Sequence, residues 1–312
     1  MRKTGLSFKQ IYKLTKRFFK KIKHKEKKNS QRGRPRKYKD EFIIAIFLYQ
    51  TLKQYSYREV LQELKYLSFK TPSLNDYHYR IKQLNENILK LLLEKTGQYF
   101  NEKIKDKIQC YIADATGFAY GDIYSLKWRR GIEVKQIKSH IRLEVIIAVD
   151  NKGKALILGC ETGKAYASEI KMLNQILNKV DFIKGLPFIA DKGYDSISVI
   201  QKILDIGLIP AIKIKETLRV KIKHPLRQLS KKNWLKYGKK RYRIESLFGN
   251  IKNKANSVFK VKREDIAKKL AIAWTILWNF YMILIYVFLF ILSVLILRRS
   301  FFDFWNSLPQ PP

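Results

Sequence analysis

Three carboxylates in this sequence have the types and positions that metal-dependent chemistry requires. Asp114 follows the apolar run IQCYIA and Asp191 follows LPFIA, so both are expected at strand ends. Glu245 is the single acid between Glu216 and Glu264, a stretch that contains sixteen lysines and arginines. Carboxylates on three separate elements can hold two Mg²⁺ or Mn²⁺ ions, because hard cations prefer oxygen ligands. Two such ions stabilise the attacking and leaving oxygens in phosphodiester chemistry.

Each carboxylate also has an ordinary structural explanation, and both explanations stay open at this point. An aspartate at a strand end is commonly a turn or cap residue. Glu245 comes four residues after Arg241, the spacing of a helix-surface ion pair worth about 0.2–0.5 kcal/mol. The rival acids are assigned to turns, a helix cap, a strand interior, loop edges or a helix first turn: Asp122, Asp150, Asp195, Glu133, Glu144, Glu161 and Glu169.

The segment around Glu245 is expected to form a helix over residues 239–254. At 100° per residue, Arg241, Gly249 and Lys252 share the face of Glu245. Gly249 costs about 1 kcal/mol of helix propensity and leaves space on that face. An adjoining apolar stripe is expected to pack on a sheet, and it consists of Ile244, Leu247, Phe248 and Ile251.

The composition is that of a folded protein with a polyanionic partner. The chain has 312 residues, of which 46% are apolar, and a net charge of +38 at pH 7. The apolar fraction excludes a disordered tail protein. The charge favours nucleic acid, because neutralised phosphates release counterions, although a lysine-rich proteome would explain part of it. Cys110 and Cys160 are expected to be buried thiols in a reducing cytosol, and residues 1–39 lack a secretory signal.

The second half of the chain predicts a mixed α/β sheet. Three strands are expected to form an antiparallel meander, followed by helix, strand, helix, strand and helix. The strands are predicted over residues 108–120, 140–150, 154–163, 186–191 and 209–214, and the two intervening helices over 166–180 and 196–207, the first capped by Ser168 and the second ending on Gly207.

The first 39 residues form a basic arm. Residues 6–25 have apolar positions at helical spacing among bases, which predicts a short basic helix. Arg32, Arg34 and Arg36 alternate around a Gly-Arg-Pro core that resembles the AT-hook, whose arginines suit a narrow minor groove. A solvated basic linker is the competing interpretation.

Residues 40–104 are interpreted as several short helices. Residues 40–52 begin with an acidic cap and are apolar on one face, and Ser56 with Glu59 has the capping-box pattern. A further helical segment is predicted over residues 71–97, ending on Gly97. Short helices after a basic arm suit a helix-turn-helix-like DNA reader, and a plain helical bundle is the alternative.

The ordered motifs DATG, FIADKGYDS and RYRIESLFGNIK resemble the DDE transposases of bacterial and archaeal insertion sequences, of groups four and five. In that family the last motif is Tyr, two residues, Arg, three residues, Glu, six residues and Lys. Arg241, Glu245 and Lys252 match it, whereas Gly238 stands at the tyrosine position and Tyr237 is one residue early. The short interval between the second and third carboxylates resembles the group-five plan, without a β-rich insertion.

The resemblance implies a ribonuclease-H-like catalytic domain in which Asp114, Asp191 and Glu245 are the catalytic, metal-binding triad. Two Mg²⁺ or Mn²⁺ ions would activate water to nick the transposon ends, and the freed 3′-OH would attack target DNA. Arg241, Lys252 and Lys192 would contact phosphates. The family implies double-stranded DNA as the partner, terminal-repeat reading by residues 1–100, a homodimer, and a nucleoid-associated cytoplasmic location.

The predicted organisation is a basic arm, a helical DNA-binding domain, a catalytic domain and an apolar extension, over residues 1–39, 40–104, 105–285 and 286–312. Residues 270–297 contain no charge, glycine or proline, so they qualify by length as a membrane span. A packed or dimer-forming helix is favoured over membrane contact. Two alternative functions remain: a non-catalytic DNA-binding protein derived from a transposase and, less favoured, a membrane-anchored basic protein.

Overall fold

A computed structural model describes the backbone of residues 5–23, 36–127, 134–216 and 222–306, with side chains except at 23, 122–138 and 289–306. Its described residues form one six-stranded sheet with the order β3-β2-β1-β4-β5, and the short β6 pairs with β1. β2 is antiparallel to both of its neighbours, β1 and β3. β4 and β6 are parallel to β1, and β5 is parallel to β4. The strands are β1 Ile108–Lys127, β2 Val134–Asp150, β3 Ala155–Lys164, β4 Pro187–Ala190, β5 Ile209–Ile212 and β6 Val258–Phe259. This is the mixed, ribonuclease-H-like sheet that the sequence predicts.

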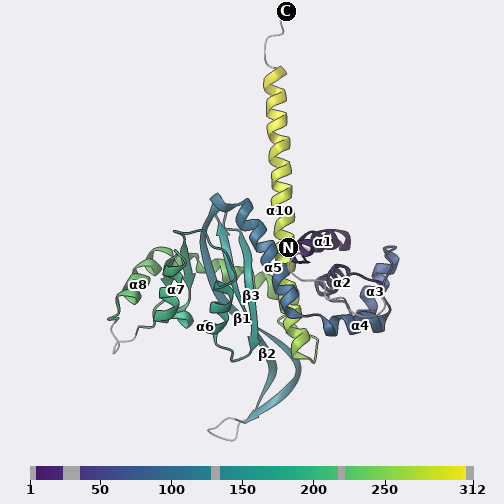
Figure 1. Cartoon of the computed structure of the whole chain (residues 1–312), viewed down its shortest axis with the longest axis horizontal. Coiled ribbons are helices and arrows are strands. Elements are labelled where there is room, and N and C mark those ends of the chain that lie inside the picture. Colours follow the sequence, from purple (N-terminus) through teal and green to yellow (C-terminus); the bar gives the residue numbers. More distant parts are fainter. Residues whose placement is uncertain (1–4, 24–35, 128–133, 217–221, 307–312) are drawn as a thin grey trace, which may run out of the picture.

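β1 is longer than predicted. It continues through Asp114 and Gly121 to Lys127, and its pairing with β2 extends to Lys127 opposite Val134 with one register shift near Gly121. The interpretations of Asp114 as the end of a strand and of Asp122 as a loop residue were therefore wrong. A ladder of backbone hydrogen bonds can continue past glycines once the partner strand lies alongside, and the two strands extend beyond the body as a long hairpin (Figure 1).

One face of the sheet is covered by helices that are distant in sequence. α5 (Glu86–Lys103) lies so close to β3 that a Cβ on Gly97 would be 2.8 Å from the Cα of Leu158. Gly97 was predicted to end a helix, and that was wrong: the helix runs on to Lys103. The predicted helix over 71–97 is also divided, because α4 (Leu74–Gln83) ends before α5 begins. Glycine at this position permits close helix–strand packing.

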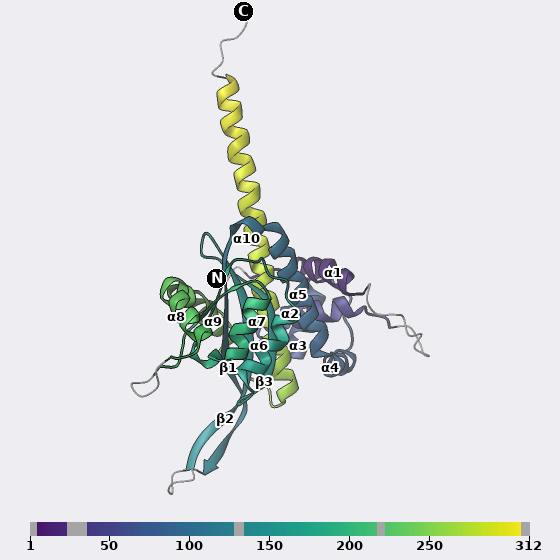
Figure 2. The ribbon, with the colours of Figure 1, turned by 60° about the vertical axis from the view of Figure 1, so that its left-hand side comes forward.

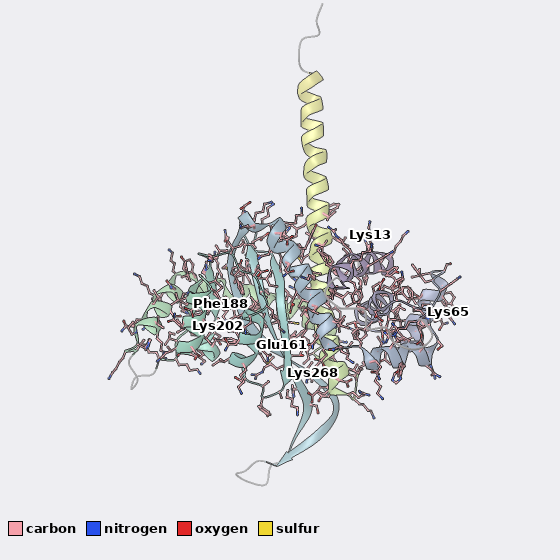
Figure 3. The ribbon with its side chains drawn as sticks, in the orientation of Figure 1. Lys13, Lys65, Glu161, Phe188, Lys202 and Lys268 are labelled. Atoms are coloured by element: carbon pink, nitrogen blue, oxygen red, sulfur yellow. The ribbon has the colours of Figure 1, made fainter. Side chains whose placement is uncertain are left out.

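The helical region before the sheet consists of α1 (Phe8–Lys23), α2 (Asp40–Lys53), α3 (Tyr57–Tyr66) and α4. α1 is an amphipathic helix that buries residues such as Phe8 and Phe18 against its neighbours, with Lys13 on the outside (Figure 3). α2 buries every residue from Ile43 to Tyr49, so the expected single apolar face was wrong. The predicted capping box of Ser56 and Glu59 at the start of α3 is confirmed.

The opposite side of the molecule carries α6 (Glu169–Leu177), α7 (Ile197–Asp205) and α8 (Pro225–Tyr237) (Figure 1). Ser168 caps α6 as predicted, accepting a hydrogen bond from the backbone of Lys171. Asp195 was expected to cap α7, but Ser196 occupies that position. Asp195 instead accepts two hydrogen bonds from Arg227 of α8. Asp195 therefore joins the start of α7 to α8 instead of capping α7.

The segment predicted as one helix over 239–254 is a short turn followed by a helix. η3 covers Gly238–Arg241 and α9 covers Tyr242–Ala255. The predicted apolar stripe of α9 is buried as expected. Between β4 and α9 the described residues add only β5 as a strand, consistent with the predicted absence of a β-rich insertion.

α10 (Glu264–Asn306) passes through the core and then leaves it (Figure 2). Its stretch Glu264–Phe288 is long and apolar enough to cross a membrane, but most of it is buried inside the protein. Asn279 is fully buried, and its side chain bonds both the N–H and the C=O of Ile157 in β3 and the hydroxyl of Thr96 in α5. The first half of the apolar segment is therefore a core helix, as one interpretation of the sequence predicted.

Candidate active site

The register of two parallel strands brings the two aspartates together. Ala113 of β1 pairs with Ala190 of β4, so the next residues, Asp114 and Asp191, follow in neighbouring strands at the same level. Pairing with β4 stops at Ala113 even though β1 itself continues. The position of Asp114 is thus the end of a strand pair rather than the end of a strand.

A single guanidinium joins these aspartates to the glutamate of α9. Nη2 of Arg241 lies 2.8 Å from Oδ2 of Asp114 and 3.8 Å from Oδ2 of Asp191. Nη1 of Arg241 donates to Oε1 of Glu245 at 2.7 Å. The exposed fractions of the carboxylate side chains are 16% for Asp114, 31% for Asp191 and 55% for Glu245. Three formal negative charges therefore surround one positive charge in a half-open site.

The helix-surface ion pair considered for Glu245 does form, but it is part of a larger cluster. Arg241 stands at the N-cap of α9 and Glu245 in its first turn, one helical turn apart. The same guanidinium reaches β1, 127 residues earlier in the chain. An isolated surface pair would leave the guanidinium of Arg241 bonded to Glu245 alone, so the pair does not explain why two aspartates meet it as well.

Burial and charge act against each other in this cluster. Burial raises the pKa of Asp114 above its usual range, although Arg241 and the backbone N–H of Ala115 oppose the shift. For Arg241, burial alone would lower the pKa, but the three carboxylates together outweigh it and raise the pKa. Nε of Arg241 is buried and has no hydrogen-bond partner. The arginine is therefore held by its two terminal nitrogens only.

The geometry has consequences for a metal ion. Among the residues whose side chains are described, no three His, Cys, Asp or Glu groups lie together as a ready metal site. The three carboxylates converge, but Arg241 lies between them and bonds the oxygens that a cation would use. The donor atoms suit Mg²⁺ or Mn²⁺, and such an ion would compete with the guanidinium for them.

Of the other residues predicted to contact DNA, Lys192 and Lys252 lie on the elements that carry the carboxylates, whereas Arg36 lies in the helical region. Lys192 is exposed directly after Asp191, and the ammonium of Lys252 lies over the ring of Phe118 at 5.8 Å. A Cβ on Gly249 would meet open space, as the sequence predicts. Arg36 is exposed and pairs with Asp40 at 3.0 Å in the helical region, while Arg32 and Arg34 lie outside the described residues.

Two residues near the site were not recognised in the sequence. Glu144 was set aside because it lies mid-strand, yet its side chain is fully buried and accepts a hydrogen bond from Tyr194. A charged residue inside the apolar run IRLEVIIAVD was the available signal, because carboxylates are rarely buried without a reason. Tyr194, in the FIADKGYDS motif, gave no signal of its own.

Comparisons with known proteins agree on the family. The model of the transposase DDE domain matches residues 105–280. An uncharacterized protein of Aquifex aeolicus (strain VF5) is 33% identical over 261 residues, which cover 82% of this chain and 81% of the relative. Because the family match spans more than half of the chain, this protein belongs to the DDE transposase family.

Solved structures of transposases are also similar to this chain at a low level. One is the piggyBac transposase in a synaptic complex with hairpin DNA, with a TM-score of 0.43 and 11% identity, covering 88% of this chain and 71% of that chain. Another is the Mos1 transposase in a paired-end complex with the left transposon end, with a TM-score of 0.28 and 11% identity, covering 85% and 82%. These values support no conclusion about function.

Proposed function

We propose that this member of the DDE transposase family binds the ends of its own insertion sequence and carries out metal-dependent cleavage and transfer of DNA strands. The observation that carries the proposal is the meeting of Asp114, Asp191 and Glu245 at the guanidinium of Arg241. A structural ion pair needs one carboxylate, so two negative charges are in excess. Excess carboxylates of this kind suit bound cations. The net charge of +38 on the whole protein suits a polyanion such as DNA.

The three carboxylates are proposed to hold two Mg²⁺ or Mn²⁺ ions. All of their donors are oxygens, the type that hard cations prefer. When bound, the ions would activate water and stabilise the attacking and leaving oxygens of the phosphodiester. The chain's own contribution is to position these oxygens: the register of β1 with β4 holds the aspartates, and α9 brings the glutamate.

Basic residues beside the carboxylates are proposed to contact the DNA phosphates. Lys192 follows the second aspartate directly and is exposed. Arg241 supplies a permanent positive charge within the cluster, and Lys252 lies about two turns beyond Glu245 on α9. These three residues would neutralise phosphates near the scissile bond without offering oxygens that compete for metal.

The remaining assignments are also proposals. Residues 1–39, with Arg32, Arg34 and Arg36, would follow the DNA backbone or minor groove, and residues 40–104 would read the terminal repeats. Residues 105–285 would carry the chemistry, and 286–312 would form an extension. The protein would act as a homodimer on double-stranded DNA, associated with the nucleoid in the cytoplasm. Membrane contact through residues 270–297 is not favoured, because the first half of that segment, with Asn279, packs inside the protein.

The test uses the purified full-length protein and linear DNA that carries the two ends of its own element. With Mg²⁺ or Mn²⁺, we expect cleavage at the ends and joining to target DNA, neither of which occurs with EDTA. Asp114→Ala and Glu245→Ala are expected to abolish both reactions. Glu216→Ala is the matched control, because Glu216 is half-exposed and pairs only with Lys231 in the described contacts.

Two outcomes would overturn parts of this proposal. If Asp114→Ala and Glu245→Ala cut as well as the parent protein, the assignment of the triad is wrong. If the parent binds its ends but does not cut with either metal, the alternative of a non-catalytic DNA-binding protein derived from a transposase is supported instead.

A further inference from the structure

A buried carboxyl behind the candidate active site has no role in the proposed function. Glu144 of β2 is 0% exposed. The hydroxyl of Tyr194 donates a hydrogen bond to Oε1 of Glu144 at 2.7 Å, while Oε2 is buried without a hydrogen-bond partner. Burial of an incompletely bonded carboxyl costs free energy, so this arrangement calls for an explanation other than stability.

The strand register relates Glu144 to the first aspartate. Glu144 pairs with Ala115, and Asp114 pairs with Val145 in the same ladder. Because successive side chains in a strand alternate between faces, Asp114 and Glu144 point to opposite faces of the sheet at the same level. Glu144 therefore lies on the face of the sheet opposite to the carboxylate cluster around Arg241.

Tyr194 connects this support to the second aspartate. It is the last residue of the turn η2 (Lys192–Tyr194), and its backbone N–H donates to the carbonyl of Asp191 at 3.1 Å. β1 lies between β4 and β2 in the sheet, so the tyrosine side chain reaches from the end of β4 past β1 to β2. On that face β1 presents Ala115 at the level of Glu144, a small residue that permits the crossing.

We propose that Glu144 is a positioning residue: through Tyr194 it holds the turn that follows β4, so that Asp191 stays beside Asp114 at a separation that suits metal binding. This inference rests on the proposed function, because it assigns to the buried carboxyl the task of supporting two proposed metal ligands. Polar groups that orient metal ligands from behind contribute about 10–100-fold to metal affinity.

A second element, α6, lies close to the same turn. A Cβ on Gly193 would lie 2.5 Å from Oε2 of Glu169, so glycine there lets α6 approach the turn closely. Glu169 is held in turn by Arg142 at 3.1 Å. The turn is thus bonded to β2 through Tyr194 and lies close to Glu169 of α6, and of these two neighbours only Glu144 of β2 has a hydrogen bond to the turn among the described contacts.

The chain offers a matched control for Glu144. Glu161, which is labelled in Figure 3, lies on β3. It pairs with Glu144 in the strand register and is also buried, at 8% exposure. Its partners are Lys90 of α5 and Lys179, which belong to the edge of the sheet away from η2. Loss of Glu161 therefore removes a buried carboxyl from the same row without touching the turn after β4.

The experiment measures Mn²⁺ binding and Mn²⁺-dependent cleavage with the full-length protein and its end DNA. Free Mn²⁺ is counted by electron paramagnetic resonance, and cleavage rates are recorded against Mn²⁺ concentration, with DNA affinity and thermal unfolding measured in parallel. The variants are Glu144→Ala, Tyr194→Phe and Glu144→Gln. Burial raises the pKa of Glu144 well above its usual range although the Tyr194 hydrogen bond opposes this, so the neutral amide of Gln is its closest substitute.

We expect Glu144→Ala and Tyr194→Phe to raise the Mn²⁺ concentration at half-saturation by about tenfold, in binding and in cleavage, with unchanged DNA affinity. Glu144→Gln is expected to stay within about threefold of the parent, because it keeps an acceptor for Tyr194. Glu161→Ala should lower thermal stability without changing the Mn²⁺ titration.

The inference is overturned if folded Tyr194→Phe binds Mn²⁺ as tightly as the parent, or if Glu161→Ala weakens Mn²⁺ binding as much as Glu144→Ala does. Should Glu144→Ala fail to fold, Tyr194→Phe and Glu144→Gln still decide the question. Failure of the proposed function looks different, because then the parent protein itself does not cut its end DNA.

Discussion

Two polar clusters, one on α10 and one at the start of α9, differ in how completely their polar groups are paired. Around Asn279 of α10, the amide bonds both backbone groups of Ile157 and the hydroxyl of Thr96, and the residue is fully buried. Around Arg241, next to α9, three carboxylates share one guanidinium in a half-open site. The first cluster is closed and balanced, so it serves stability. The second is unbalanced, because three carboxylates face a single guanidinium, and this excess of negative charge is what the proposed metal site would use.

The largest stability effect is expected in the balanced cluster. Asn279→Ala leaves the N–H and C=O of Ile157 without these partners, which should lower the free energy of unfolding by about 2–4 kcal/mol. Urea unfolding measures this loss. Thr96→Val, which removes one hydroxyl at the edge of the same cluster, should cost about 1 kcal/mol. An equal effect of both variants would contradict a cluster centred on Asn279.

A smaller effect is expected at Arg241. In metal-free protein, Arg241→Ala leaves three carboxylates without their shared cation and should cost about 1–2 kcal/mol, between the values for exposed and buried ion pairs. Added Mn²⁺ should recover more stability in this variant than in the parent, as measured by thermal unfolding. Arg36→Ala, in an exposed pair with Asp40, is the control and should respond to Mn²⁺ like the parent. A parent-like Mn²⁺ response of Arg241→Ala would contradict competition between metal and guanidinium.

Glycines in the two regions should respond in opposite directions. Gly249→Ala on α9 meets open space and should raise the free energy of unfolding by about 0.5–1 kcal/mol through helix propensity. Gly97→Ala beside β3 meets the backbone of Leu158 and should lower it by about 1–3 kcal/mol. Urea unfolding of both variants distinguishes the open site from the closed interface. If Gly249→Ala also weakens DNA binding, the open space on α9 is used by DNA.

The smallest expected effect is the contribution of Asp114 to the pH dependence of the free energy of unfolding. The pKa of its carboxyl is raised above the unfolded value of 3.8, mainly by burial, so the folded protein holds this proton to higher pH than the unfolded chain does. The contribution of Asp114 to stability therefore falls as pH rises from about 3.8 through the raised pKa. In metal-free urea unfolding between about pH 4 and 7, Asp114→Asn should lack this slope. A slope identical to that of the parent would show that the Asp114 carboxyl is not perturbed.

Local patterns predicted most elements of this fold. The buried strand before Asp191, the capping box at Ser56 and the end of α7 just before Gly207 depend on residues close in sequence. Gly97 shows where such patterns fail, because a glycine in a helix is locally a stop signal and here serves contact with β3. Glu144 shows the same limit, since its mid-strand position says nothing about which side chain will reach it.

By itself, the sequence determined the charge of the protein, the succession of its first five strands along the chain and the three candidate carboxylates. Only the tertiary structure decided that Arg241 joins all three carboxylates, and that the Tyr194 side chain extends past β1 to Glu144 of β2. The physical reason is that periodicity and capping act over a few residues. Strand register and helix docking bring together side chains separated by 127 positions, as for Arg241 and Asp114.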